Sequence, residues 1–106
     1  RRALVVADRG EKAWLNTTYQ DAKSLYPRLL RPVGHRFRDA DGWGYSKVEV
    51  DELIDRLSDY FDGKTDLSAR EVREAVFGSA KDNHAYDESV VDVYLERAAS
   101  VLLSVE

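Results

Sequence analysis

Cysteine and methionine are both absent from this chain of 106 residues, and proline occurs only twice. Without cysteine there is no disulfide framework, thiolate zinc site or cysteine nucleophile, which fits a reducing compartment. The longest apolar run, residues 3–7, is far shorter than the roughly 20 residues of a membrane-spanning helix, and no signal peptide surrounds it. We therefore expect a cytoplasmic protein. Because the chain begins on Arg1-Arg2 rather than on Met, we also expect a processed chain or a fragment.

Basic residues are also fewer than acidic ones. Lys and Arg number 16 against 20 Asp and Glu, for a net charge of -4. Nucleic acids and anionic membranes are polyanions, so this balance opposes general binding to either. Residues 28–38 nevertheless hold several arginines and no acid, whereas the charged residues within 39–62 are mostly acidic. Two interpretations remain: solvated faces that partly neutralise each other, or a local basic docking patch.

The remaining composition is that of a folded domain. Hydrophobic residues make up 43% of the chain and charged residues 34%, and the length suits a single domain. We expect one helical domain over residues 1–106, composed of an N-terminal segment (1–31) and two repeated units (32–61 and 65–105).

The repeat emerges when the sequence is compared with itself at an offset of 41 residues. GYSKVEVDELIDRL recurs as AYDESVVDVYLERA. The identical pairs are Tyr45 with Tyr86, Val50 with Val91, Asp51 with Asp92, and Arg56 with Arg97.

Each copy predicts an amphipathic helix, because its apolar residues recur at spacings of three and four. Ser46, with Glu49 three residues later, is the expected N-cap of the first helix, and Asp87 that of the second. A third helix is predicted between them, starting at Ser68 and ending at Phe77.

Further elements follow from proline and glycine. Asp62-Gly63 predicts a turn after the first repeat helix. Upstream we expect a helix over residues 14–26 and a short one over residues 32–37, because prolines more readily begin helices than interrupt them. Residues 3–7 fit either a short strand or a helix edge. The predicted fold class is all-α, a small bundle of about four to five helices containing two helix-loop-helix repeats.

The repeat resembles the DivIVA-domain family of bacterial cell-division and polarity proteins, over roughly residues 32–105. In that family a short helix ending in Phe is followed by a loop and a Gly-Tyr-Asp helix start, then Val-Asp and an aromatic or aliphatic pair. The matching residues are Phe37, Gly44, Tyr45, Val50 and Asp51 in the first copy, and Phe77, Tyr86, Asp87, Val91, Asp92, Tyr94 and Leu95 in the second.

The resemblance implies a non-catalytic interaction or scaffold module that acts through protein partners or through self-association of its helices. A homodimer and a compact internal bundle both fit apolar stripes of this length. Membrane contact is not expected, because residues 78–85 contain no large apolar residue. The resemblance further implies a role in bacterial cell division or polar growth.

The alternative is a regulatory ion- or ligand-binding domain that uses residues 39–45. Asp39, Asp41 and Gly44 match three positions of a calcium loop, but Val50 stands where a bidentate carboxylate should close the site. His35 and His84 have no second ligand at metal-binding spacing. No nucleophile elbow or phosphate-binding loop is present. We therefore expect no enzyme activity, no metal and no cofactor.

Overall fold

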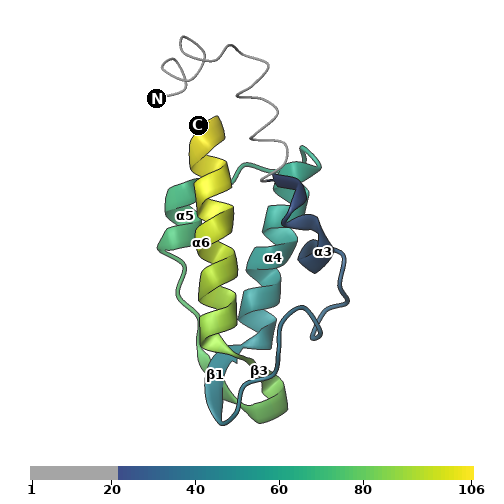
Figure 1. Ribbon diagram of the computed structural model, residues 1–106, viewed down its shortest axis with the longest axis vertical. Helices are drawn as coiled ribbons and strands as arrows, with labels where there is room; N and C mark the ends of the chain where they lie inside the picture. Colours follow the sequence, from purple (N-terminus) through teal and green to yellow (C-terminus); the bar gives the residue numbers. More distant parts are fainter. Residues whose placement is uncertain (1–21) are drawn as a thin grey trace.

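Two long helices form the body of the molecule, and the computed structural model describes them within residues 22–106. Helices α4 (Lys47–Phe61) and α6 (Glu88–Val105) lie side by side and both start at a small sheet at one end (Figure 1). The short helices α3 (Tyr26–Leu29) and α5 (Ala69–Arg73) flank them, with α3 packed on α4 and α5 on α6. The expected segment at residues 3–7 and most of the helix predicted over 14–26 lie outside the described residues.

The sheet makes the fold α+β, so the all-α prediction was wrong. Strands β1 (Trp43–Ser46), β2 (Ser79–Lys81) and β3 (Ala85–Tyr86) form an antiparallel sheet in the order β2-β1-β3. A single 3-10 turn, η1 (Asp82–His84), connects β2 to β3. Strands of two to four residues are too short to show an alternating pattern, which is why periodicity did not reveal them.

The short helix predicted over residues 32–37 is also wrong, because the short helix in this region, α3, ends at Leu29, before the predicted first copy begins. Pro27 stands in the first turn of α3, where its missing N–H is tolerated. The backbone N–H of Gly34 donates to Asp51 (2.9 Å), and that of Arg36 donates to the Tyr86 hydroxyl (3.3 Å). These N–H groups bond to distant side chains, so the segment is a loop.

The helix ends agree with the sequence in three places and differ in two. The Asp87 carboxylate accepts from the backbone N–H groups of Ser89 and Val90 and caps α6. Ser68 and Glu71 form the expected capping box at α5. Gly63, at φ +75°, ends α4 in a Schellman-type turn at the predicted Asp62-Gly63 position.

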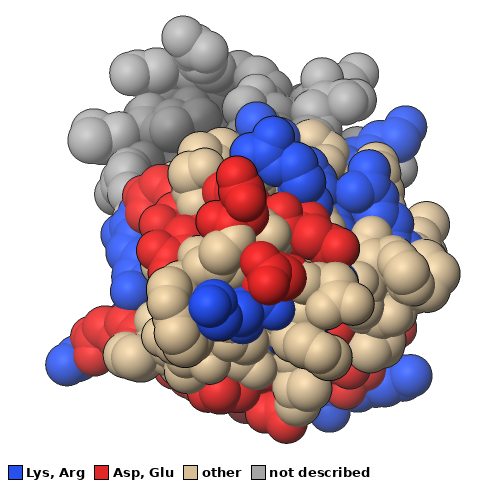
Figure 2. All heavy atoms as spheres, turned by 90° about the horizontal axis from the view of Figure 1, so that it is seen from below, with Lys and Arg blue, Asp and Glu red and all other residues tan. Residues whose placement is uncertain are grey.

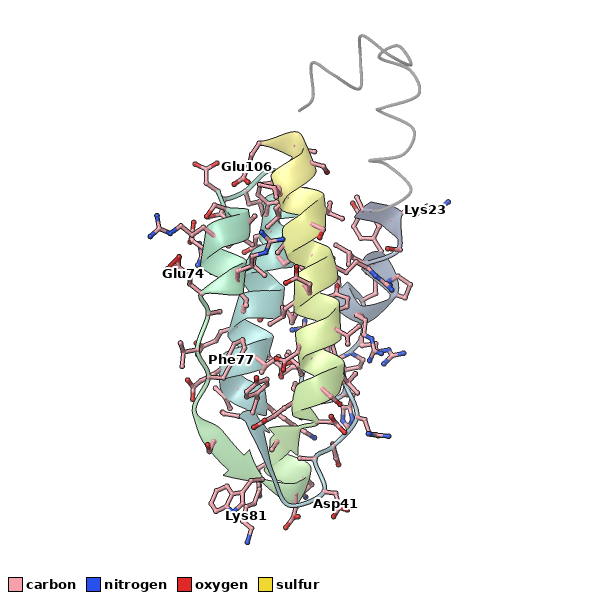
Figure 3. The ribbon with its side chains drawn as sticks, turned by 60° about the vertical axis from the view of Figure 1, so that its left-hand side comes forward. Lys23, Asp41, Glu74, Phe77, Lys81 and Glu106 are labelled. Carbon is pink, nitrogen blue, oxygen red and sulfur yellow. The ribbon has the colours of Figure 1, made fainter. Side chains whose placement is uncertain are left out.

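The two differences concern α4 and α5. Ser46 precedes α4 but makes no side-chain cap bond. The expected partner Glu49 accepts instead from the backbone N–H of Gly78 (3.0 Å). Helix α5 ends at Arg73, so Phe77 does not close it as predicted. Phe77 lies on the extended segment between α5 and β2 (Figure 3).

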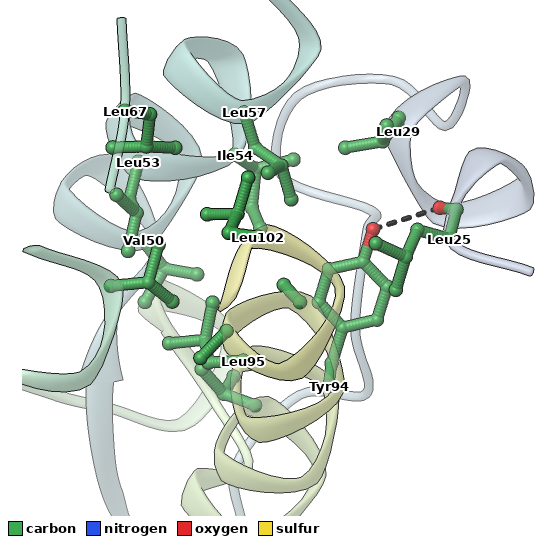
Figure 4. Packing of buried hydrophobic residues seen from close by; sticks show 14 of the residues in the cluster. Leu25, Leu29, Val50, Leu53, Ile54, Leu57, Leu67, Tyr94, Leu95 and Leu102 are labelled. Carbon is green, nitrogen blue, oxygen red and sulfur yellow. Dashed lines mark hydrogen bonds between the residues drawn. The ribbon is translucent and has the colours of Figure 1, made fainter. Parts of the chain in front are cut away.

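The hydrophobic core fills the space between the helices (Figure 4). The stripes predicted for the two repeat helices face each other there, with Val50 and Ile54 from α4 against Val91 and Leu102 from α6. At the α3 side, the Tyr94 hydroxyl donates to the backbone carbonyl of Leu25 (2.8 Å).

Candidate functional site

The two copies of the repeat meet as an internal pair with approximate two-fold symmetry. Tyr45 of β1 and Tyr86 of β3 are directly paired in the sheet. The backbone bonds flanking them match: Ser46 N–H donates to the Gly78 carbonyl (2.8 Å), and Asp87 N–H donates to the Arg38 carbonyl (2.8 Å). The segment that precedes the sheet strand in each copy therefore pairs with the helix-start strand of the other copy.

The repeated Tyr and Asp residues form reciprocal hydrogen bonds between the copies. The Tyr86 hydroxyl donates to Asp51 Oδ1 (2.8 Å), and the Tyr45 hydroxyl donates to Asp92 Oδ1 (2.8 Å). Burial, together with the neighbouring carboxylate, raises the pKa of each tyrosine to about 12. Each copy thus uses its Tyr to hold the helix of the other.

The aromatic residues of the motif also make contacts between the two copies. The Phe37 ring packs edge-on against Tyr86, with centroids 5.3 Å apart, and the Phe77 ring lies 5.2 Å from Tyr45. Gly44 is required at the centre, because a Cβ there would overlap the Tyr86 carbonyl oxygen and the Ala40 side chain.

The remaining motif residues support this pair. Val50, Val91, Tyr94 and Leu95 are buried in the core. Asp87 caps α6, and its hydrogen bond from Arg38 lowers the pKa of that carboxyl well below its usual range. The motif selected from the sequence therefore builds the fold, and the surfaces available to a ligand lie beside it.

The first half of the pair is closed by Arg36, which is only 6% exposed. Its guanidinium donates to the Asp51 carbonyl (3.2 Å) and to Asp55 Oδ1 (2.8 Å), and it lies 3.6 Å from Asp51 Oδ1. No buried side-chain polar atom within residues 22–106 lacks a partner.

The second half is open. Beside Tyr45 lies a hollow of about 210 Å³, which we call the Tyr45 pocket; its lining includes Phe77, Asp92, Glu96 and Arg73. Arg73 donates to Glu96 (3.1 Å) at this surface. Val76, which precedes Phe77 as Arg36 precedes Phe37, is 88% exposed.

A larger hollow of about 440 Å³ lies between α3 and α6. We call it the arginine groove, after Arg28, Arg31 and Arg97 in its lining. Its apolar part includes Val93, which is 66% exposed, and Tyr94. Burial and then the neighbouring Arg31 lower the pKa of Arg28.

The arginines of residues 22–106 divide into two sets. Those outside the groove each lie in an ion pair with an acid: Arg36, Arg38, Arg56, Arg70 and Arg73. The three that line the groove have no acidic partner among the described residues. Within the basic stretch at residues 28–38, Arg36 and Arg38 are therefore neutralised by acids, whereas Arg28 and Arg31 are not.

At the sheet end of the molecule, basic side chains are neutralised by acidic ones. Arg38 pairs there with Asp87, and Lys47 with Asp39. Acidic and basic side chains lie next to each other on this face (Figure 2). Neither sign of charge forms a single continuous surface at this end.

The loop at residues 39–45 has little of the geometry of an ion site. Asp39 is held by Lys47, and the backbone N–H of Gly42 donates to Asp82 Oδ1 (3.1 Å). Throughout residues 22–106, no three His, Cys, Asp or Glu side chains gather closely enough to hold a metal ion. In the same part of the chain, no helix has the length and apolar character needed to cross a membrane.

Comparisons with protein-family models, with curated proteins and with solved structures found no match to this chain. The resemblance to the DivIVA-domain family therefore rests on the motif residues themselves.

Sequence reasoning did not identify Arg97 as a lining residue of the arginine groove. Arg97 was seen only as a repeat position. Arg97 and Val93 lie one helical turn apart on α6, a spacing that places them on the same face.

Proposed function

We propose that this chain is a non-catalytic protein-interaction module of the cytoplasm, which binds an acidic segment of a partner protein in the arginine groove. The observation that carries the proposal is that the three arginines without an acidic partner in the described part of the chain all line one groove. Its resemblance to DivIVA-domain proteins supports a scaffold or adaptor role in bacterial cell division or polar growth.

The groove suits a peptide segment in size and chemistry. Its volume of about 440 Å³ lies within the range of specific ligand sites. Guanidinium groups bind carboxylates through paired, charge-assisted hydrogen bonds. Exposed Val93 supplies apolar contact beside them, so the preferred segment combines Glu or Asp with an aliphatic residue.

Self-association through the predicted stripes is a weaker proposal. Val91, Tyr94 and Val101 are all buried inside the chain. A dimer formed through these residues would have to open the internal pair and expose its core. We therefore expect a monomer, whose mass in light scattering does not change over about a hundredfold range of concentration.

A binding experiment tests the groove. The full chain, labelled with ¹⁵N, is titrated with the peptide acetyl-Glu-Leu-Glu-Glu-Leu-amide and with its glutamine counterpart. We expect amide shifts that concentrate on α3 and the first turns of α6, and weaker binding of the glutamine peptide. Arg97→Gln should weaken binding of the acidic peptide by about tenfold, because a charge-assisted hydrogen bond is lost. The matched control Arg70→Gln removes an exposed arginine elsewhere and should have no effect.

A second experiment tests the adaptor role in bacterial cells. A photo-crosslinking residue is placed at Val93, and adducts are compared between the unchanged chain, Arg97→Gln and Arg70→Gln. We expect a protein adduct that Arg97→Gln abolishes and Arg70→Gln preserves. Peptide shifts scattered over the whole surface, together with adducts insensitive to Arg97, would contradict the proposal.

A further inference from the structure

The Tyr45 pocket has a filled counterpart in the other half of the molecule. Around Tyr86 and Asp51, the space is occupied by the Arg36 side chain, which is 6% exposed. At the corresponding sequence position, directly before Phe77, the chain has Val76, which is 88% exposed and does not line the hollow beside Tyr45 and Asp92. One half therefore contains a buried guanidinium, and the other has a hollow of about 210 Å³.

The lining of the Tyr45 pocket repeats the groups that surround Arg36. Asp92 corresponds to Asp51, and Glu96 to Asp55. In the filled half, Asp51 accepts from Tyr86 through Oδ1 and from the Gly34 N–H through Oδ2. In the open half, Asp92 accepts from Tyr45 through Oδ1.

The aromatic wall of the pocket is also repeated. Phe77 corresponds to Phe37, whose ring carries the Arg28 guanidinium at 4.9 Å from its centroid. Rings of this kind attract guanidinium groups, which stack on their faces. Arg73 at the pocket bonds to Glu96 (3.1 Å) and is substantially exposed, so it does not fill the place that Arg36 takes in the other half.

We infer that the Tyr45 pocket accepts an arginine side chain from a partner protein, which occupies the place that Arg36 occupies in the closed half. The volume is below that of typical small-molecule sites, which begin at about 300 Å³, and suits a single side chain. An incoming guanidinium would bridge Asp92 and Glu96 as Arg36 bridges Asp51 and Asp55, with the Phe77 ring in the wall of the pocket. The inference is independent of the arginine groove, because the two sites take ligands of opposite charge.

The first test uses a single arginine as the probe. The ¹⁵N-labelled full chain is titrated with N-acetyl-arginine methylamide and, separately, with its uncharged citrulline counterpart. We expect shifts concentrated on Tyr45, Phe77, Asp92 and Glu96, and citrulline binding weaker by about tenfold or more. Asp92→Asn should reduce arginine binding similarly while keeping an acceptor for Tyr45. Asp59→Asn, at an exposed site on α4, is the matched control and should change nothing.

The same titrations can overturn the inference. Arginine shifts that are scattered over the surface, matched by citrulline or undiminished in Asp92→Asn would contradict a site for arginine in the Tyr45 pocket.

Discussion

The half of the molecule around Tyr86 and Asp51 is closed, whereas the half around Tyr45 and Asp92 is open to solvent. Both halves use the same tyrosine-to-aspartate hydrogen bond at the same length of 2.8 Å. They differ in what lies beside the bond: the buried Arg36 side chain in the closed half, and the Tyr45 pocket in the open half. A repeated motif can therefore hold two helices together in both copies and still leave the bond of one copy open to solvent.

The cover differs because the connecting segments differ in length. Helix α3 ends at Leu29, well before Phe37, so the first connection is long enough to fold back. Gly34, at φ +85°, bends it so that Arg36 reaches the interior. Helix α5 ends at Arg73, only a few residues before Phe77, and the second connection runs straight to the sheet.

The largest expected effect comes from removing the Arg36 guanidinium, which covers the closed half. Arg36→Met should lower the free energy of unfolding by about 3–5 kcal/mol, because it leaves the Asp51 carboxylate buried without its cation. Arg73→Met, at the exposed pair of the open half, should cost about 0–1 kcal/mol. Urea unfolding of the two variants measures the difference. Equal losses would show that the two halves are not distinguished by the cover.

The tyrosines give a smaller and better matched contrast. Tyr86→Phe removes a buried bond to a charged acceptor and should cost about 1.5–3 kcal/mol. Tyr45→Phe removes the equivalent bond at the surface and should cost about 0.5–1 kcal/mol. Both substitutions keep the ring, so urea unfolding isolates the hydroxyl. A larger loss for Tyr45→Phe would reverse the assignment of closed and open halves.

Alkaline pH should weaken both halves. The pKa of Tyr45 and that of Tyr86 are each raised from 10.0 to about 12, first by burial. Above pH 10 the unfolded chain releases these protons while the folded chain retains them. The contribution of these two tyrosines to the free energy of unfolding is therefore fully present below pH 10, and it falls as the pH rises towards 12. Phenolate absorbance in the two Tyr→Phe variants separates the groups; an unshifted Tyr45 would mean that the open half is fully hydrated.

The smallest effect concerns the helix starts. Asp87 caps α6 through its carboxylate, whereas Ser46 makes no side-chain cap at α4. Asp87→Ala should therefore lower the melting temperature, and Ser46→Ala should leave it nearly unchanged. Thermal unfolding followed by circular dichroism tests the pair. Equal shifts would imply that Ser46 caps α4 in solution.

The sequence predicted the helices better than the loops between them. The apolar spacing around Val50 and Val91 correctly located α4 and α6. It failed at residues 32–37 because backbone N–H groups there bond to side chains far along the chain. The candidate site was predicted only in part: the basic stretch contained Arg28 and Arg31, but which arginines keep an acidic partner depends on tertiary contacts.

By itself the sequence determined the duplication, the two long helices, the caps at Ser68 and Asp87 and the turn at Gly63. These features depend on residues within a few positions of each other, where spacing and side-chain chemistry are sufficient. Only the tertiary structure decided the sheet, the reciprocal tyrosine bonds and the burial of Arg36. The two tyrosine bonds join residues 35 and 47 positions apart, and such contacts exist only once the copies have packed together.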